Sequence, residues 1–257
     1  MTGFQEFKNL HEQNSLLHIG NAWDANSAIL FQSLGYQAIG TSSAAIAESL
    51  GYQDGEEMSF DELFSIVKQI KQSISLPLTV DLEFGYSNEL AGVLQNIISL
   101  AEIGVAGINL EDSRVDNGVR KIVDADKFGA VVRGIRDGLS KKGINVFLNI
   151  RTDAFLMGLD DPLTESVTRA RVYEASGADG IFVPRITNDA HIEKIVGSVS
   201  IPVNVMGVPG LPVFSRLQEL GVKRVSIGPF FYKKMNQYFA REIDSINESE
   251  SFDSLFS

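Results

Sequence analysis

The chain has 257 residues, of which 44% are hydrophobic, and a formal net charge of −11 from 33 acidic and 22 basic residues. An acidic chain without a basic stripe is a poor match for nucleic acid. The polar N-terminus and the lack of a long apolar run argue against a membrane protein and predict a cytoplasmic one. The absence of cysteine excludes disulfides, thiolate metal sites and cysteine catalysis.

Eight short β-rich runs recur along the chain, with amphipathic segments of helical character between them. In chain order, the predicted strand segments are 16–23, 34–43, 75–83, 103–112, 143–153, 176–185, 200–208 and 220–229. Four of these segments contain a glycine near their start, as in "LGYQAIGTSS", which is typical of the left-handed residue that ends a helix. Strands that alternate with helices favour parallel pairing.

Eight such units in a chain of about 250 residues predict an α/β fold of the parallel (β/α)8 barrel type. An open doubly wound sheet is the alternative, and the lack of a G-x-G-x-x-G motif after the first strand disfavours it. We expect one domain over residues 1–257, including a C-terminal helical extension at about residues 230–257.

Polar side chains gather where the predicted strands end, which is where barrels of this type carry their chemistry. From the first strand to the seventh, they are Asn21, Trp23 and Asp24; Ser42 and Ser43; Asp81 and Glu83; Asn109, Glu111 and Asp112; Asn149, Arg151 and Asp153; Arg185; and Asn204.

Three of these carboxylates are expected to converge. Asp81 and Glu83 occupy alternate positions of one strand and so share a face, and Glu111 belongs to the neighbouring strand. Carboxylates packed together repel one another, and a divalent cation removes that penalty. An all-oxygen site suits Mg²⁺, with Mn²⁺ as a substitute, and the three histidines show no zinc-type spacing.

Several of these residues also have a structural interpretation. Asp24 and the two serines at 42 and 43 precede helical segments and are suited to cap them. Alternatively, the loop at Ser42 and Ser43 offers backbone N–H groups to an anion. Arg151 is suited to pair with Glu111, and Asp153 reads as structural.

Seven stretches, in this order, carry a resemblance to a known family: "NAWDANSA", "GTSSAAIAESLGYQDGE", "LTVDLEFGY", "IGVAGINLED", "LNIRTDAF", "SGADGIFVP" and "VPGLP". Together they cover much of the chain, and in combination they are specific. The sequence resembles the isocitrate lyase/phosphoenolpyruvate mutase superfamily, closest in character to its cysteine-free 2-oxo acid lyases and decarboxylases.

The resemblance implies a role for each matching residue. Asp81 is similar to the direct Mg²⁺ ligand, and Asp54, Glu83 and Glu111 to groups that hold metal-bound water. The loop of Ser42, Ser43 and Ala44 is similar to the one that binds the substrate carboxylate, to which Trp23 and Asn204 add further contacts. Arg151 is similar to the arginine that faces the reacting oxygen, so Arg151, Glu111 and Asp54 are the candidate catalytic residues. The resemblance also implies a homo-oligomer, a dimer of dimers, in which the C-terminal helix is exchanged between barrels.

The loop at 113–123 departs from the superfamily, because it lacks the cysteine motif of isocitrate and methylisocitrate lyases. We expect this polar loop, which contains Asn117-Gly118, to be a mobile lid. A site without cysteine suits decarboxylation of an oxaloacetate-type substrate, because departing CO₂ needs no general acid. The alternatives are another C–C lyase acting on a small dicarboxylate or 2-oxo acid, a phosphonopyruvate/phosphoenolpyruvate mutase or hydrolase that breaks a P–C bond, and a barrel that binds an oxo acid without catalysis.

Overall fold

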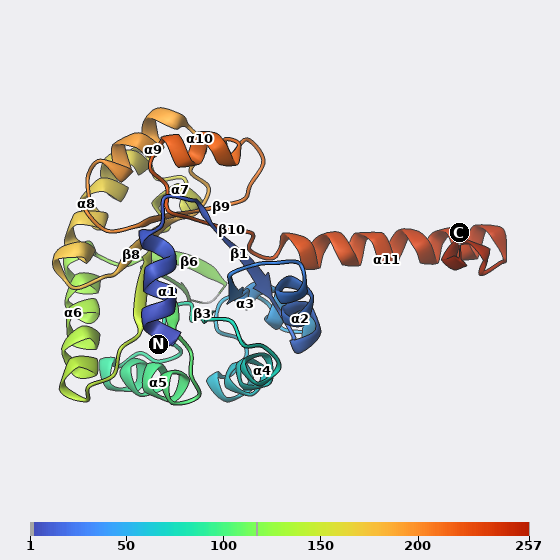
Figure 1. The fold of residues 1–257 in the computed structure, drawn as a ribbon, viewed down its shortest axis with the longest axis horizontal. Coiled ribbons are helices and arrows are strands. Elements are labelled where there is room, and N and C mark those ends of the chain that lie inside the picture. The colour runs from blue at the N-terminus through green and yellow to red at the C-terminus, as the bar shows by residue number, and fades with distance from the viewer. Residues whose placement is uncertain (1–2, 117, 257) are drawn as a thin grey trace.

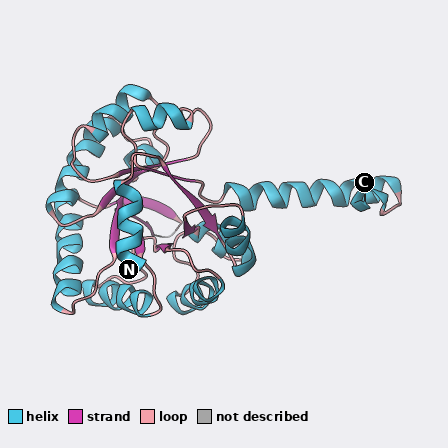
Figure 2. Ribbon diagram, viewed as in Figure 1, coloured by secondary structure: helices cyan, strands magenta, loops and turns pink. Residues whose placement is uncertain are grey.

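The computed structural model describes residues 3–116 and 118–256. It confirms the predicted barrel, because eight parallel strands close in the order β1-β10-β9-β8-β7-β4-β3-β2 (Figure 1). The strands form the centre of the molecule, and helices surround them (Figure 2). Each of the eight predicted strand segments contains one barrel strand.

The barrel strands are β1 (Leu17–Ala22), β2 (Ala38–Thr41), β3 (Leu78–Asp81), β4 (Gly107–Glu111), β7 (Phe147–Arg151), β8 (Gly180–Val183), β9 (Val203–Met206) and β10 (Arg224–Ser226). The helices are α1 (Gly3–Glu12), α2 (Ala25–Ser33), α3 (Ser43–Ser49), α4 (Phe60–Ser73), α5 (Leu90–Glu102), α6 (Ala125–Lys141), α7 (Ala154–Met157), α8 (Pro162–Ala175), α9 (Asp189–Val196), α10 (Phe214–Glu219) and α11 (Phe230–Ser249), with a short 3₁₀ helix, η1, at Asp253–Phe256.

Glycines end the helices that lead into four of the strands. Gly35, Gly104, Gly177 and Gly221 have φ angles of 85°, 91°, 98° and 85°. This left-handed conformation is costly for residues with a Cβ and is the usual way for a helix to end before the chain turns. The glycines predicted to punctuate the sequence therefore set the points at which the chain enters the barrel.

Helix α4 illustrates how the surrounding helices are fixed to the barrel. It begins with a capping box, in which the Ser59 side chain accepts from the Glu62 backbone and the Glu62 side chain accepts from the Ser59 backbone. Its residues Leu63, Val67 and Ile70 follow helical spacing and are fully buried. One face of the helix therefore belongs to the core, and the cap defines where that face begins.

Helix α1 covers the end of the barrel at which the strands begin (Figure 1). The Phe7 ring is fully buried and lies edge-on to the Phe147 ring, with centroids 5.4 Å apart. The His11 ring stacks on the Phe147 ring, with centroids 4.4 Å apart. A Cβ at Gly107 would lie 2.9 Å from the Phe7 ring, so glycine is needed for this close approach.

Two features lie outside the regular barrel. The segment predicted as a lid forms an antiparallel hairpin of β5 (Ser113–Asp116) and β6 (Val119–Ile122), while Asn117 lies outside the described residues. Helix α11 projects away from the barrel (Figure 1). Over the described part of the chain, no helix combines the length and the hydropathy of a membrane span.

Replacing Phe7 with alanine tests the role of α1 as the floor of the barrel. The substitution leaves a cavity among buried aromatic rings, so we expect the free energy of unfolding to fall by about 3–5 kcal/mol. Leu34→Ala is the control, because Leu34 is 68% exposed. Chemical denaturation that gave both variants the same stability would contradict this packing.

Candidate functional site

The ends of three neighbouring strands bring together two acidic residues and an arginine. Asp81 is the last residue of β3, Glu111 the last of β4 and Arg151 the last of β7. Glu111 and Arg151 are register partners in the parallel ladder. Asp81 and Glu111, two of the three carboxylates expected to converge, thus lie at adjacent strand ends, with Arg151 at the end of the next strand.

Glu111 and Arg151 form a buried ion pair. Nη1 of Arg151 lies 2.9 Å from Oε2 of Glu111, and the Arg151 Nε donates to Oδ1 of Asp153 at 2.6 Å. Burial raises the pKa of Glu111 well above its usual value, while the nearby Arg151 opposes that rise. Arg151 is therefore oriented by two carboxylates and stays charged.

Arg120, on strand β6 of the hairpin, is a site residue that the sequence analysis missed. Its guanidinium contacts Glu111, lies 3.2 Å from the Asp153 carboxylate and reaches Oδ2 of Asp54 at 3.5 Å. The signal was available, because "VDNGV" places Asn-Gly between alternating residues, as in a two-residue hairpin. Recognising a hairpin within the predicted lid would have indicated that alternate side chains of β6 point toward the strand ends.

The position of Glu83 differs from the one that strand alternation predicted. Strand β3 ends at Asp81, and Glu83 lies beyond it with a φ of 50°. Its side chain is nevertheless buried, and the Tyr86 hydroxyl donates to Oε1 at 2.7 Å, whereas Oε2 has no partner among the described residues. Burial, followed by the negative charge of Asp54, raises the pKa of Glu83 to about 8.

Ser43 joins two carboxylates that are far apart in the sequence. Its hydroxyl donates to Oδ2 of Asp81 at 2.8 Å and lies 3.5 Å from Oδ1 of Asp54. Burial and the Asp81 charge raise the pKa of Asp54. Ser43 thereby brings the loop that carries Asp54 close to the end of β3.

The donor set is chemically suited to a hard divalent cation, since it consists of carboxylate oxygens. The unpartnered, buried Oε2 of Glu83 is an oxygen that lacks a positive or donating neighbour. In their present positions, however, no three histidine, aspartate or glutamate side chains of the described residues form a ready metal-binding group. Arg120 and Arg151 provide the positive charge beside Glu111 instead.

A cavity of about 570 Å³ opens at the carboxyl ends of the strands. Of the residues expected to bind substrate or metal, it is lined by Ser42, Ser43, Ala44, Asp54, Asp81 and Arg151. Glu83 and Glu111 are buried behind this lining. The cavity therefore contains the predicted carboxylate loop, two predicted acidic residues and the predicted arginine.

Two residues expected to contact substrate have other surroundings. The Asn204 side chain is buried in the barrel interior and accepts from Nδ2 of Asn149 at 3.3 Å. The Trp23 ring packs on Tyr232 of α11, with centroids 5.3 Å apart. Neither is part of the cavity lining. Asp24 and Ser42 are the N-caps of α2 and α3, as their structural interpretation predicted.

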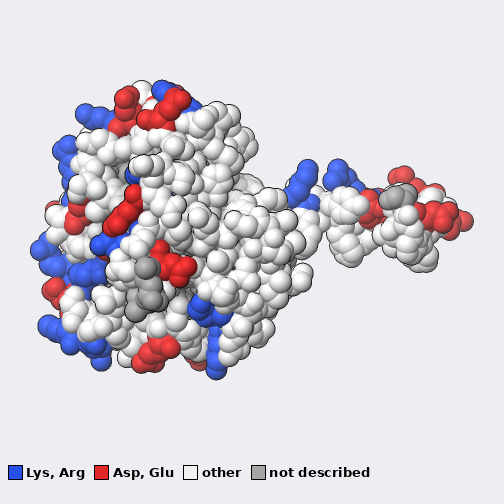
Figure 3. All heavy atoms as spheres, in the orientation of Figure 1, with Lys and Arg blue, Asp and Glu red and all other residues white. Residues whose placement is uncertain are grey.

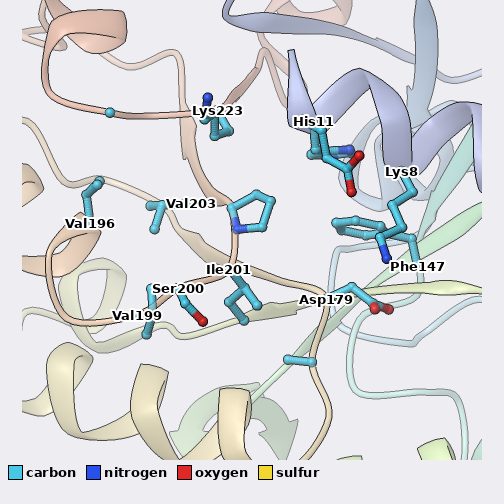
Figure 4. A pocket seen from close by; sticks show the side chains of 14 residues that line it. Lys8, His11, Phe147, Asp179, Val196, Val199, Ser200, Ile201, Val203 and Lys223 are labelled. Atoms are coloured by element: carbon cyan, nitrogen blue, oxygen red, sulfur yellow. The ribbon is translucent and has the colours of Figure 1, made fainter. Parts of the chain in front are cut away.

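A second cavity, of about 580 Å³, lies at the opposite end of the barrel beside α1 (Figure 4). Two of its charged groups, Asp179 and Lys223, already serve the fold. Asp179 accepts from the Leu148 backbone at 2.8 Å, and Lys223 donates to the Gln13 carbonyl at 3.0 Å. Because these groups hold the chain together, the cavity at the carboxyl ends is the better candidate for chemistry.

The charged side chains on one face of the molecule can be followed in Figure 3. On the face drawn in Figure 3, lysine and arginine are interspersed with aspartate and glutamate. This distribution agrees with the acidic net charge and the lack of a basic stripe in the sequence.

Comparison with known proteins identifies relatives over nearly the whole chain. Residues 7–247 match the family model described as phosphoenolpyruvate phosphomutase. An uncharacterized protein of Mycobacterium tuberculosis is 32% identical over 226 residues, which are 88% of this chain and 83% of the relative. An oxaloacetate decarboxylase of Pseudomonas savastanoi pv. phaseolicola is 28% identical over 226 residues, which are 85% of this chain and 76% of the relative.

The fold is also found in a solved structure described as phosphoenolpyruvate phosphomutase from Streptomyces platensis subsp. rosaceus. It superposes with a TM-score of 0.87 over 99% of this chain and 90% of its own, at 18% identity. This likeness concerns the fold alone.

The raised pKa of Glu83 predicts how stability depends on pH when a chelator is present. The folded protein keeps this proton up to about pH 8, whereas an unfolded chain releases it near the ordinary value of 4.5. The folded state therefore binds more protons between these values, and the free energy of unfolding falls as the pH rises through them. Glu83→Gln should flatten this dependence in urea denaturation with EDTA, and Glu48→Gln, at an exposed position, should not. An unchanged slope in Glu83→Gln would contradict the raised pKa.

Proposed function

Because the chain belongs to the phosphoenolpyruvate phosphomutase family, within the isocitrate lyase/phosphoenolpyruvate mutase superfamily of lyases and mutases, we propose that it is a Mg²⁺-dependent carbon–carbon lyase. The substrate is a small 2-oxo acid, and the favoured reaction is decarboxylation of the oxaloacetate type. One observation carries the proposal: Asp54, Asp81 and Arg151 share one cavity at the carboxyl ends of the strands. The relative named oxaloacetate decarboxylase supports the choice of reaction.

The carboxylates near the cavity fit the proposed cation by their chemistry. Asp81 would hold Mg²⁺ or Mn²⁺, and Asp54, Glu83 and Glu111 would hold its water molecules. The unpartnered Oε2 of Glu83 supports this assignment, because a buried carboxylate oxygen is costly without a partner. When bound, the cation would supply a Lewis acid for the 2-oxo group.

The protein's own residues account for the remaining requirements. The loop of Ser42, Ser43 and Ala44 binds the carboxylate next to the 2-oxo group and so orients the substrate. Cleavage of the C3–C4 bond releases CO₂ and leaves its electron pair in an enolate, whose oxygen Arg151 stabilises. A proton from water then returns to C3. No cysteine or other general acid is required for the departing CO₂.

A second candidate function is cleavage or transfer at a P–C bond, as in a phosphonopyruvate/phosphoenolpyruvate mutase or hydrolase. The family description, phosphoenolpyruvate phosphomutase, favours it. A barrel that only binds an oxo acid is the alternative of another class. Turnover separates this last alternative from both enzymes.

Assays with oxaloacetate, phosphonopyruvate and 2-methylisocitrate, with and without Mg²⁺, test the proposed function. We expect oxaloacetate to be converted to pyruvate, EDTA to abolish the activity and Mg²⁺ or Mn²⁺ to restore it. Turnover of phosphonopyruvate alone would select the second candidate, and no turnover of any substrate would contradict both. Full activity in demonstrably metal-free protein would exclude Mg²⁺ dependence.

Asp81→Asn tests the proposed metal ligand directly. It keeps the side-chain shape and loses the charge, so we expect activity to fall by about 100-fold or more and Mg²⁺ binding in calorimetry to weaken. Asp61→Asn, at an exposed position on α4, is the control. Wild-type metal affinity in Asp81→Asn would remove this residue from the metal site.

Helix α11 supports a further part of the proposal, a homo-oligomer in which this helix is exchanged between barrels. It projects from the barrel (Figure 1). Large apolar side chains along its length are exposed. They are Phe231, Met235, Tyr238, Phe239 and Ile243, each 42–65% exposed. A monomer rarely leaves so many large apolar side chains in water. A second copy of this chain, packed against α11, would cover them.

The mass in solution tests the exchanged helix. We expect light scattering to give the mass of a tetramer for the wild type and a smaller species for Phe239→Glu, because a charge cannot be buried in an apolar interface. Glu242→Gln on the same helix is the control. A monomeric wild type would contradict the proposed oligomer.

A further inference from the structure

Two cationic side chains of the candidate site have no side-chain partner among the described residues. Arg185 and Lys233 line the same cavity as Asp81 and Arg151. In contrast to Arg120 and Arg151, which are held by carboxylates, neither forms an ion pair or a side-chain hydrogen bond within residues 3–116 and 118–256. The positive charge that remains available in this cavity therefore belongs to Arg185 and Lys233.

The backbone at Arg185 is in an uncommon conformation. Strand β8 ends at Val183, and after Pro184 the chain passes through Arg185 with a φ of 62°. A side chain with a Cβ adopts this left-handed conformation at a cost, and such residues cluster at functional sites. The buried Ile186 that follows fixes the turn in the core. The turn therefore holds Arg185 at the cavity wall although glycine would be less strained.

Lys233 reaches the cavity from a different element, the first part of α11. Aromatic contacts fix this part of the helix to the barrel: Tyr232 lies against Trp23 at 5.3 Å and Phe231 against Phe31 at 5.8 Å between centroids. Phe230 adds an apolar side chain to the same cavity wall. Two segments far apart in sequence thus each place one unpaired cation at one cavity.

We propose that Arg185 and Lys233 form a subsite for a second anionic group of the substrate, a carboxylate or a phosphonate. This inference rests on the proposed function, in which the 2-oxo acid end lies against Ser43, Asp81 and Arg151. It makes the substrate a short acid with negative charge at both ends. Charge complementarity supports it, because a guanidinium and an ammonium are the usual partners of carboxylate and phosphonate groups.

The subsite acts on the two proposed reactions differently. A carboxylate that leaves as CO₂ loses its charge in the transition state, so cations that hold it increase affinity without increasing kcat. A phosphonate keeps its charge during P–C cleavage, so the same cations also stabilise its transition state. For oxaloacetate, we therefore expect Arg185→Gln to raise KM about tenfold or more while kcat does not fall, because the binding that is lost exists in the ground state and not in the transition state.

Calorimetry with non-reacting probes and Mg²⁺ tests the subsite. Oxalate occupies only the 2-oxo acid end, whereas L-malate and 2-hydroxy-3-phosphonopropanoate carry a second anionic group as carboxylate or phosphonate. We expect Arg185→Gln and Lys233→Gln to lose about tenfold or more in affinity for one or both of the longer probes and to keep wild-type affinity for oxalate. The probe with the larger loss identifies the terminal group that the subsite prefers.

Lys234→Gln is the matched control, because Lys234 is exposed on the same helix turn and does not line the cavity. Unchanged affinity of both subsite variants for the longer probes would overturn the subsite while the proposed function stands. An equal loss for oxalate would also overturn it, since the substitutions would then act on the whole site. A wild-type protein that binds none of the three probes would overturn the proposed function together with the subsite.

Discussion

The arrangement of the candidate site depends on the burial of carboxylates at the ends of adjacent parallel strands. Glu111 is nearly inaccessible, and in a parallel sheet its nearest lateral neighbour is the register partner on the next strand. That partner is Arg151. Each member of the pair also has a second partner of opposite charge, Arg120 for Glu111 and Asp153 for Arg151. The strand register therefore determines both which charge neutralises Glu111 and where Arg151 lies, and it does so before any ligand binds.

A second layer of polar contacts supports this pair from behind. Asp112 is fully buried, and it accepts hydrogen bonds from the Tyr173 hydroxyl at 2.8 Å and from the Asp153 backbone N–H at 3.0 Å. Arg169 of α8 completes the set at 3.0 Å. Because Asp153 in turn holds the Arg151 guanidinium, a helix on the outside of the barrel contributes to the orientation of the arginine in the cavity. Buried polar networks of this kind are stable only when nearly every member has a partner.

The sequence predicted those features that follow from periodicity and from residues with one dominant conformation. Eight strands and the glycine-ended helices are of this kind, and so are Asp81, Glu111 and Arg151, each the last residue of its strand. Alternation failed at Glu83 because the strand ends two residues earlier. Alternation also predicts that the Asn204 side chain points into the barrel, but not how deep in the barrel it lies. That depth depends on the shear of the closed sheet. Arg120 was missed because the Asn-Gly signal of its hairpin was interpreted as part of a loop.

Helix α1 separates an unusual charge from water. Directly above Phe7, Arg224 extends from β10 into the barrel interior, fully buried, with one hydrogen bond of 3.2 Å to Oδ1 of Asn109. Its Nε and Nη1 have no partner among the described residues. Detachment of α1 from the barrel would lose aromatic packing, but it would also let water hydrate this guanidinium. The net free energy of detaching α1 is therefore smaller than the buried area of the helix suggests. The floor of the barrel is consequently easier to hydrate than its aromatic packing alone would suggest, at the end opposite to the candidate site.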